Sequence, residues 1–119
     1  MSLAHLPPGA VVDVELGKPP ATTGHEIQKR RPCVVLVHMP PLGLLMVVPV
    51  SKGKPKVMGY TNVALQPSAA NGLADPCFAQ CHQLRTVDAQ RVKKVRGRLT
   101  AYDLSMVKMT LQRLLGLAA

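Results

Sequence analysis

Basic side chains gather in three short stretches of this chain, which carries 15 lysines and arginines against 6 acidic residues and a formal charge of +9. Guanidinium and ammonium groups bind phosphates and carboxylates, so this charge favours nucleic acid, an anionic membrane surface or an acidic protein segment as a partner. Charge alone does not choose among these three. The stretches are Lys29, Arg30 and Arg31 at the end of a polar loop, Lys52, Lys54 and Lys56 after a serine, and Arg91, Lys93, Lys94, Arg96 and Arg98.

The third stretch does not form one continuous basic stripe if it is a regular strand. Positions 94, 96 and 98 share one face of such a strand, while positions 91 and 93 share the other. We expect part of this stretch to contact phosphate, which makes binding sensitive to salt, and the rest to protect an edge strand from aggregation. The second stretch follows Ser51 in a loop with glycine and proline, and is better placed to flank a groove.

Cys77, Cys81 and His82 are the residues that invite a metal, because cysteine and histidine are the usual ligands of zinc. No suitable fourth ligand is nearby, and on one strand the two cysteines would lie about 13 Å apart. We therefore interpret both cysteines as small buried apolar residues. The sequence has no glycine-rich phosphate loop, paired-carboxylate metal motif or nucleophile elbow, so we expect no metal and no cofactor.

The composition predicts one folded domain over residues 1–119, because 47% of the chain is apolar. Three aromatic residues are too few for the stacking platforms on which many RNA-binding sheets rely. We expect a cytosolic protein with reduced thiols, since the first residues do not resemble a signal peptide. An uncharged run, Pro32 to Val50, has prolines and a glycine at its centre, and predicts two buried strands around a turn rather than a membrane span.

The elements that must position these side chains are mostly strands, since 11 prolines and 9 glycines divide the chain. Thr100 and Asp103 resemble a capping box, and the apolar spacing up to Gly116 predicts a C-terminal helix. We expect Pro49 to mark where its strand leaves the ladder, and Gly59 to mark a bulge. The predicted strands are Ala10 to Leu16, Cys33 to His38, Leu44 to Val50, Val57 to Leu65, Phe78 to Val87 and Val92 to Leu99, with a long loop at Gly17 to Lys29 and one helical turn at Pro67 to Gly72.

An ordered set of short motifs resembles the MazF/PemK (Kid) family of toxins from type II toxin–antitoxin modules. The resemblance covers about residues 7 to 117, and its motifs are GHE in a loop, RRPCVVL, VVPVS, QLRTVDAQR and GRLT-x-x-DL. It implies a mainly β, SH3-like small barrel of the CcdB/MazF type with a C-terminal helix, assembled as a homodimer. It also implies a metal-independent endoribonuclease that cleaves single-stranded RNA, and a partner antitoxin with an acidic tail; no membrane is implied.

The resemblance assigns catalytic roles to Arg31, Ser51 and Glu26. Arg31 would stabilise the phosphorane with its forked donors, and Ser51, where many members have threonine, would donate another hydrogen bond. The alternative for Ser51 is a turn hydroxyl that binds local backbone. Glu26 would orient Arg31 or accept the 2′-hydroxyl proton, unless it only forms a loop salt bridge. Some members have an arginine and an aspartate where this chain has Gln80 and His82.

Two histidines are further candidates for acid–base chemistry, because imidazole titrates near neutrality. They are His82, in place of that aspartate, and His25, which as a lone loop histidine could equally be a bystander. The residues expected to bind RNA are Lys29, Arg30, Lys52, Lys54, Lys56, Gln80, Gln83 and Arg85.

Two other functions are compatible with this chain. One is a catalytically weakened member that binds an antitoxin or a nucleic acid; the other is a toxin of the CcdB type, which has a similar fold and acts on DNA gyrase. The Arg31-Pro32 strand opening and the spacing of Glu26 favour the ribonuclease, because they belong to the RNA-cleaving branch.

Overall fold

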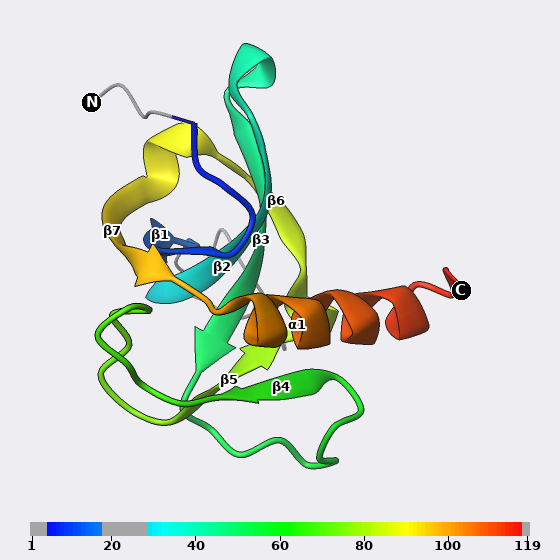
Figure 1. Ribbon diagram of the computed structural model, residues 1–119. Coiled ribbons are helices and arrows are strands. Elements are labelled where there is room, and N and C mark those ends of the chain that lie inside the picture. Colours follow the sequence, from blue (N-terminus) through cyan, green and yellow to red (C-terminus); the bar gives the residue numbers. More distant parts are fainter. Residues whose placement is uncertain (1–4, 18–28, 118–119) are drawn as a thin grey trace.

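The computed structural model describes residues 5–17 and 29–117, which form a curved antiparallel sheet and one long helix (Figure 1). The mainly β prediction with a C-terminal helix is confirmed. The strands are β1 (Ala10–Glu15), β2 (Arg30–Met39), β3 (Leu44–Ser51), β4 (Asn62–Leu65), β5 (Cys77–Gln80), β6 (Arg85–Asp88) and β7 (Val92–Arg98), followed by helix α1 (Ala101–Leu114).

Strand β3 is shared by two parts of the sheet. The strands follow the order β4-β5-β3-β2-β1-β7, and β6 pairs with the first half of β3. On that edge β3 pairs with β6 up to Val47 and with β5 from Val50 onward. Strands β4 and β7 are not paired with each other in the described residues, so the barrel is open between them.

The β2–β3 hairpin is the longest pairing of the sheet and carries a bulge. Its tip is a 3-10 turn (Pro40–Leu42) ended by Gly43, whose φ of +65° is left-handed and favours glycine. Below the tip the register shifts between Val35 and Val37, so that β2 has one extra residue relative to β3. Pro49 does not leave this ladder as expected; it pairs with Cys33 and lies where the other edge of β3 changes partner.

Two apolar clusters occupy the two faces of the sheet, as the alternating strand sequences predict. Val12, Cys33 and Val35 belong to one cluster, and Val11 and Val34, their neighbours in sequence, belong to the other. Helix α1 covers the second cluster with Val107 and Leu111. Thr100 caps the helix by accepting a hydrogen bond from the Asp103 N–H at 3.1 Å, as predicted. No helix in the described part of the chain is long and apolar enough to span a membrane.

Two predicted strands are interrupted in the structure. The segment Val57 to Leu65 forms a strand only from Asn62, because Gly59 has a left-handed φ of +74° and lies in a turn rather than a bulge. The segment Phe78 to Val87 divides into β5 and β6 around a 3-10 turn, η2 (Cys81–Gln83).

The predicted helical turn at Pro67 to Gly72 is confirmed. Ser68 caps it through its hydroxyl, which accepts from the Asn71 N–H at 3.1 Å, and Gly72 ends it with a φ of +67°. This turn lies directly against β7, since the Arg98 N–H donates to the Ala70 carbonyl at 2.8 Å. A Cβ on Gly72 would overlap the carbonyl oxygen of Arg96.

Candidate functional site

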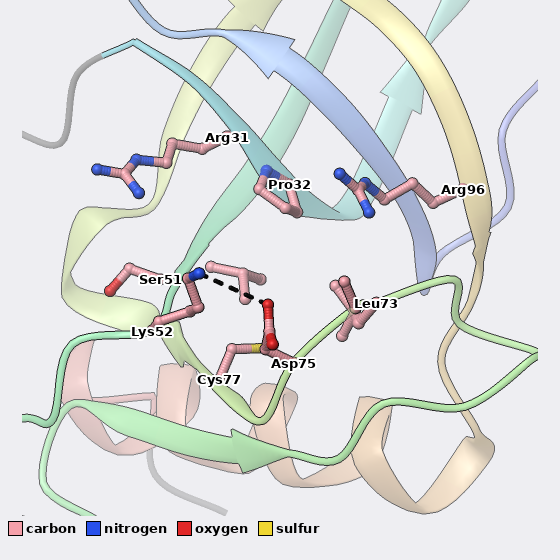
Figure 2. Close-up of a pocket in the computed structure, with 10 residues that line it drawn as sticks. Arg31, Pro32, Ser51, Lys52, Leu73, Asp75, Cys77 and Arg96 are labelled. Carbon is pink, nitrogen blue, oxygen red and sulfur yellow. Dashed lines mark ion pairs between the residues drawn. The ribbon is translucent and has the colours of Figure 1, made fainter.

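Arg31 and Ser51 lie at the open end of the β2–β3 hairpin and line the same cavity. The last paired residues of the ladder at this end are Cys33 and Pro49; Arg31 lies two residues before Cys33, and Ser51 lies two residues after Pro49. The guanidinium of Arg31 and the hydroxyl of Ser51 extend to the same side in Figure 2. The Nε of Arg31 is buried and has no hydrogen-bond partner among residues 5–17 and 29–117, an arrangement that costs stability.

A cavity of about 210 Å³ lies beside this pair (Figure 2). Its lining combines apolar and charged side chains, a combination suited to holding a charged ligand against a shaped surface. The residues that line it are Arg31, Pro32, Val50, Ser51, Lys52, Leu73, Ala74, Asp75, Cys77 and Arg96.

An exposed ion pair joins two loops at this cavity. The Nζ of Lys52, just after β3, lies 3.5 Å from a carboxylate oxygen of Asp75, just before β5. Both side chains are more than half exposed, at 73% and 54%, so the pair is worth less than about 1 kcal/mol and exchanges readily. A phosphate could therefore replace Asp75 as the partner of Lys52.

A tighter ionic cluster holds Arg96 at the opposite wall of the cavity. The carboxylate of Asp13, on β1 and 5% exposed, accepts a hydrogen bond from the Nε of Arg96 at 2.6 Å. The Nη1 of Arg96 donates to the Gly72 carbonyl at 3.0 Å. Arg30 approaches the other oxygen of Asp13 at 3.6 Å, and its side chain is half exposed. Two of the predicted basic stretches thus meet on one buried carboxylate.

Ser51 also contacts the side chain of Gln80. The Gln80 amide donates from Nε2 to the Ser51 hydroxyl oxygen at 3.3 Å, so Ser51 has a side-chain partner 29 positions away in the chain. Gln80 also lines a second cavity, of about 310 Å³, together with His82 and Lys56. His82 therefore belongs to the second cavity rather than to the one beside Arg31.

The other predicted site residues are dispersed. Lys29 and Lys54 are exposed on loops, and Arg85 donates from Nη2 to the side-chain oxygen of Gln83 at 2.8 Å. Within the third basic stretch, only Arg96 lines the cavity, while Arg91 donates to the Glu15 carbonyl at 3.1 Å. His25 and Glu26 lie outside the described residues.

The three cysteines are buried, and their thiols are unreactive near neutral pH. Burial raises the pKa of Cys33 to about 12 and that of Cys81 to about 11, and it also raises the pKa of Cys77. Such thiols stay protonated near neutral pH and are weak nucleophiles and weak metal ligands. Across the described ranges, no group of three or more His, Cys, Asp or Glu residues is arranged to hold a metal ion.

Sequence reasoning missed Asp75, Asp13 and the apolar base of the cavity. Asp75 had a signal, because it is an isolated acid in a loop directly before a strand. Asp13 had only a weaker one, since the alternation that predicts β1 places it on a face expected to be polar. The cavity lies between segments far apart in the chain, and nothing in the local pattern brings them together.

The family model that matches this chain is described as "PemK-like, MazF-like toxin of type II toxin-antitoxin system", and it matches residues 8–115. None of the curated proteins matches the chain in sequence.

Three solved structures illustrate the shared fold. The Mycobacterium tuberculosis toxin MazF-mt6 is 18% identical with a TM-score of 0.69, and the match covers 93% of this chain and 99% of that one. MazF from Deinococcus radiodurans is 24% identical with a TM-score of 0.73, covering 95% and 98%. An endoribonuclease in complex with its cognate antitoxin, from a mycobacterial species, is 17% identical with a TM-score of 0.70, covering 94% and 96%.

Proposed function

The chain belongs to the PemK-like, MazF-like family of type II toxins, and we propose that it is an endoribonuclease that cleaves single-stranded RNA without a metal ion. The observation that carries this proposal is that the Arg31 guanidinium and the Ser51 hydroxyl come from neighbouring strands and line the same cavity. A structural relative that is an endoribonuclease supports it.

In the proposed reaction the ribose 2′-oxygen attacks the adjacent phosphorus, and the bond from phosphorus to the 5′-oxygen of the next nucleotide breaks. Negative charge gathers on the non-bridging oxygens of the phosphorane. Arg31, whose side chain lines the cavity, donates to these oxygens. The Ser51 oxygen accepts from Gln80, so the hydroxyl hydrogen stays available to donate to the same phosphate.

Two protons must also move, one from the 2′-hydroxyl and one to the leaving 5′-oxygen. Glu26 is our candidate for orienting Arg31 or accepting the first proton. His82 is an alternative acid or base. It lines the second cavity together with Gln80, whose side chain is hydrogen-bonded to Ser51 in the first cavity. Asp75 is the only carboxylate among the described residues that line the first cavity, and incoming RNA would compete with it for Lys52.

The partners follow from the same charges. We propose that a homodimer of this chain binds an antitoxin whose acidic tail occupies the cavity and pairs with Lys52 and Arg31 in place of RNA. Structural relatives solved with an antitoxin support this assignment. Antitoxin and RNA would then exclude each other.

Cleavage of a long single-stranded RNA in EDTA tests the proposal, with primer extension locating the cuts. We expect discrete cuts by the wild-type protein and a loss of about 10²–10³ in rate for Arg31→Ala, the range found when one such donor is removed. Ser51→Ala should lose activity, while Ser51→Thr keeps the hydroxyl and should retain it. Lys108→Ala, an exposed change on α1, is the control.

The proposal is wrong if the folded wild-type protein makes no cuts, or if Arg31→Ala cuts as fast as wild type. Salt-sensitive RNA binding without cleavage would instead support the binding-module alternative.

A further inference from the structure

Building on the proposed ribonuclease function, we propose that the second cavity binds one nucleobase of the RNA beside the cleaved phosphate. Tyr60 would stack on this base and Gln80 would accept a hydrogen bond from its edge. The first cavity would then hold the phosphate, and the second would select the sequence.

The second cavity lies between the loop that follows β3 and the 3-10 turn η2. Its volume of about 310 Å³ is at the lower end of the range for small-ligand cavities, about 300–1,000 Å³. Among the described residues its lining holds no carboxylate, one lysine and one histidine beside several uncharged side chains, so it suits a neutral planar group better than a second phosphate. The lining residues are Pro55, Lys56, Val57, Tyr60, Thr61, Gln80 and His82.

Gln80 is the residue that gives this cavity its polar selectivity. It is only 7% exposed, yet it lines the cavity, and its Nε2 is engaged with the Ser51 hydroxyl. Its Oε1 accepts no hydrogen bond from any described residue, so this oxygen is available to a ligand in the cavity that Gln80 lines. An amide oxygen there accepts from an amino or imino group of a base.

Tyr60 supplies an aromatic surface. Its side chain is 60% exposed although it lines the cavity, so one ring face is available to a ligand. Single-stranded RNA is read by bases that leave their stack and lie against aromatic rings. One tyrosine cannot form a platform for several bases, but it is sufficient for one.

The Gln80–Ser51 hydrogen bond connects the two cavities. Because Ser51 is proposed to hold the phosphate and Gln80 to contact the base, the nucleotide read is the one attached to the cleaved phosphate or its direct neighbour. Lys56, exposed at the second cavity, can pair with the next phosphate along the strand.

A series of short RNAs tests the inference, each carrying the preferred cut site with one nucleotide made abasic. For the wild-type protein, we expect one position where removing the base lowers kcat/KM about tenfold, within the range for stacking on one ring. In Tyr60→Ala, removal of the base at that one position should no longer lower kcat/KM, while removal at the other positions should have the same effect as in wild type. Tyr60→Phe, which keeps the ring, should behave as wild type.

Gln80→Met provides a second readout. It removes the bond to Ser51, which lowers the rate for all bases alike, so the informative quantity is the ratio of kcat/KM between the best and worst base at that position. We expect this ratio to fall about tenfold, while Tyr60→Ala leaves it within about threefold of wild type.

The inference is overturned if no abasic position depends on Tyr60, or if the base ratio is unchanged in Gln80→Met. Cleavage lost in Arg31→Ala establishes the proposed function independently of either result. If the wild-type protein binds RNA without cutting it, the same abasic series is read from dissociation constants, which tests the cavity while the proposed function fails.

Discussion

Replacing Asp13 by asparagine should destabilise the protein, although Asp13 touches neither of the two cavities directly. Asp13 is buried on β1 and receives a short hydrogen bond from Arg96 and a longer ion pair from Arg30. An asparagine side chain at this position would keep an acceptor for Arg96 but lose the negative charge. The two guanidinium groups would then share no counter-ion.

The size of the effect can be worked from these contacts. A hydrogen bond to a charged group contributes about 1.5–3 kcal/mol, and a neutral one about 1 kcal/mol, so the Arg96 contact loses about 0.5–2 kcal/mol. The Arg30 pair is half exposed and adds less than about 1 kcal/mol. We expect a total loss of about 2 kcal/mol in the free energy of unfolding. For 119 residues this lowers Tm by about 8 °C.

Urea titration at one fixed protein concentration measures the change, and it should lower the midpoint without altering the slope. Asp88→Asn is the matched control, because Asp88 is exposed and asparagine can still cap the Gln90 N–H. The reasoning is refuted if Asp13→Asn is no more destabilising than this control. Greater stability than wild type would mean that desolvation of the carboxylate outweighs its pairing.

Two further predictions concern burial and backbone conformation. Burial raises the pKa of Cys33 from its ordinary 9.0 to about 12, and Arg85 lowers this pKa by a smaller amount. The contribution of the thiol to folding stability is therefore complete below pH 9 and is lost as the pH rises toward 12. Between pH 9 and 11, the free energy of unfolding of Cys33→Ala should fall less steeply with pH than that of wild type, by up to about 1.4 kcal/mol per pH unit. Urea titrations at several pH values measure both, and an equal dependence on pH in the two proteins would contradict this. Gly72→Ala should cost clearly more stability than Gly43→Ala, because both glycines have a left-handed φ, +67° and +65°, but only at Gly72 does a Cβ meet backbone, the carbonyl of Arg96. Equal shifts of Tm would show that the turn at Gly72 moves away from β7 without cost.

The elements that sequence patterns predicted best are those decided by local chemistry. The capped helix after Thr100 and the turn from Ser68 to Gly72 each depend on a few neighbouring residues, and both are confirmed. The hairpin was predictable because two β-branched runs flank a proline-rich turn. The break in the segment from Phe78 to Val87 was not, because Cys81 donates its N–H to Thr61 in another loop and no local pattern reveals that partner.

The candidate site was predictable only in part, for the same reason. The resemblance pointed to Arg31 and Ser51, and the structure places both in the lining of one cavity. Asp75 and Arg96 reach the cavity from segments distant in sequence, so only the fold reveals them. The bond from Gln80 to Ser51 crosses 29 positions and depends on β3 exchanging β6 for β5.

The bulge in β2 limits how this gene can change in length. The position of Arg31 relative to Ser51 depends on the residues of the ladder between the hairpin tip and the Cys33–Pro49 pair, including the extra residue near Leu36. A deletion or insertion of one codon between the bulge and the cavity would turn alternate side chains to the opposite face and separate the pair while leaving the hydrophobic composition unchanged. Descendants of this gene should therefore keep the hairpin at constant length, or change it with compensation in both strands.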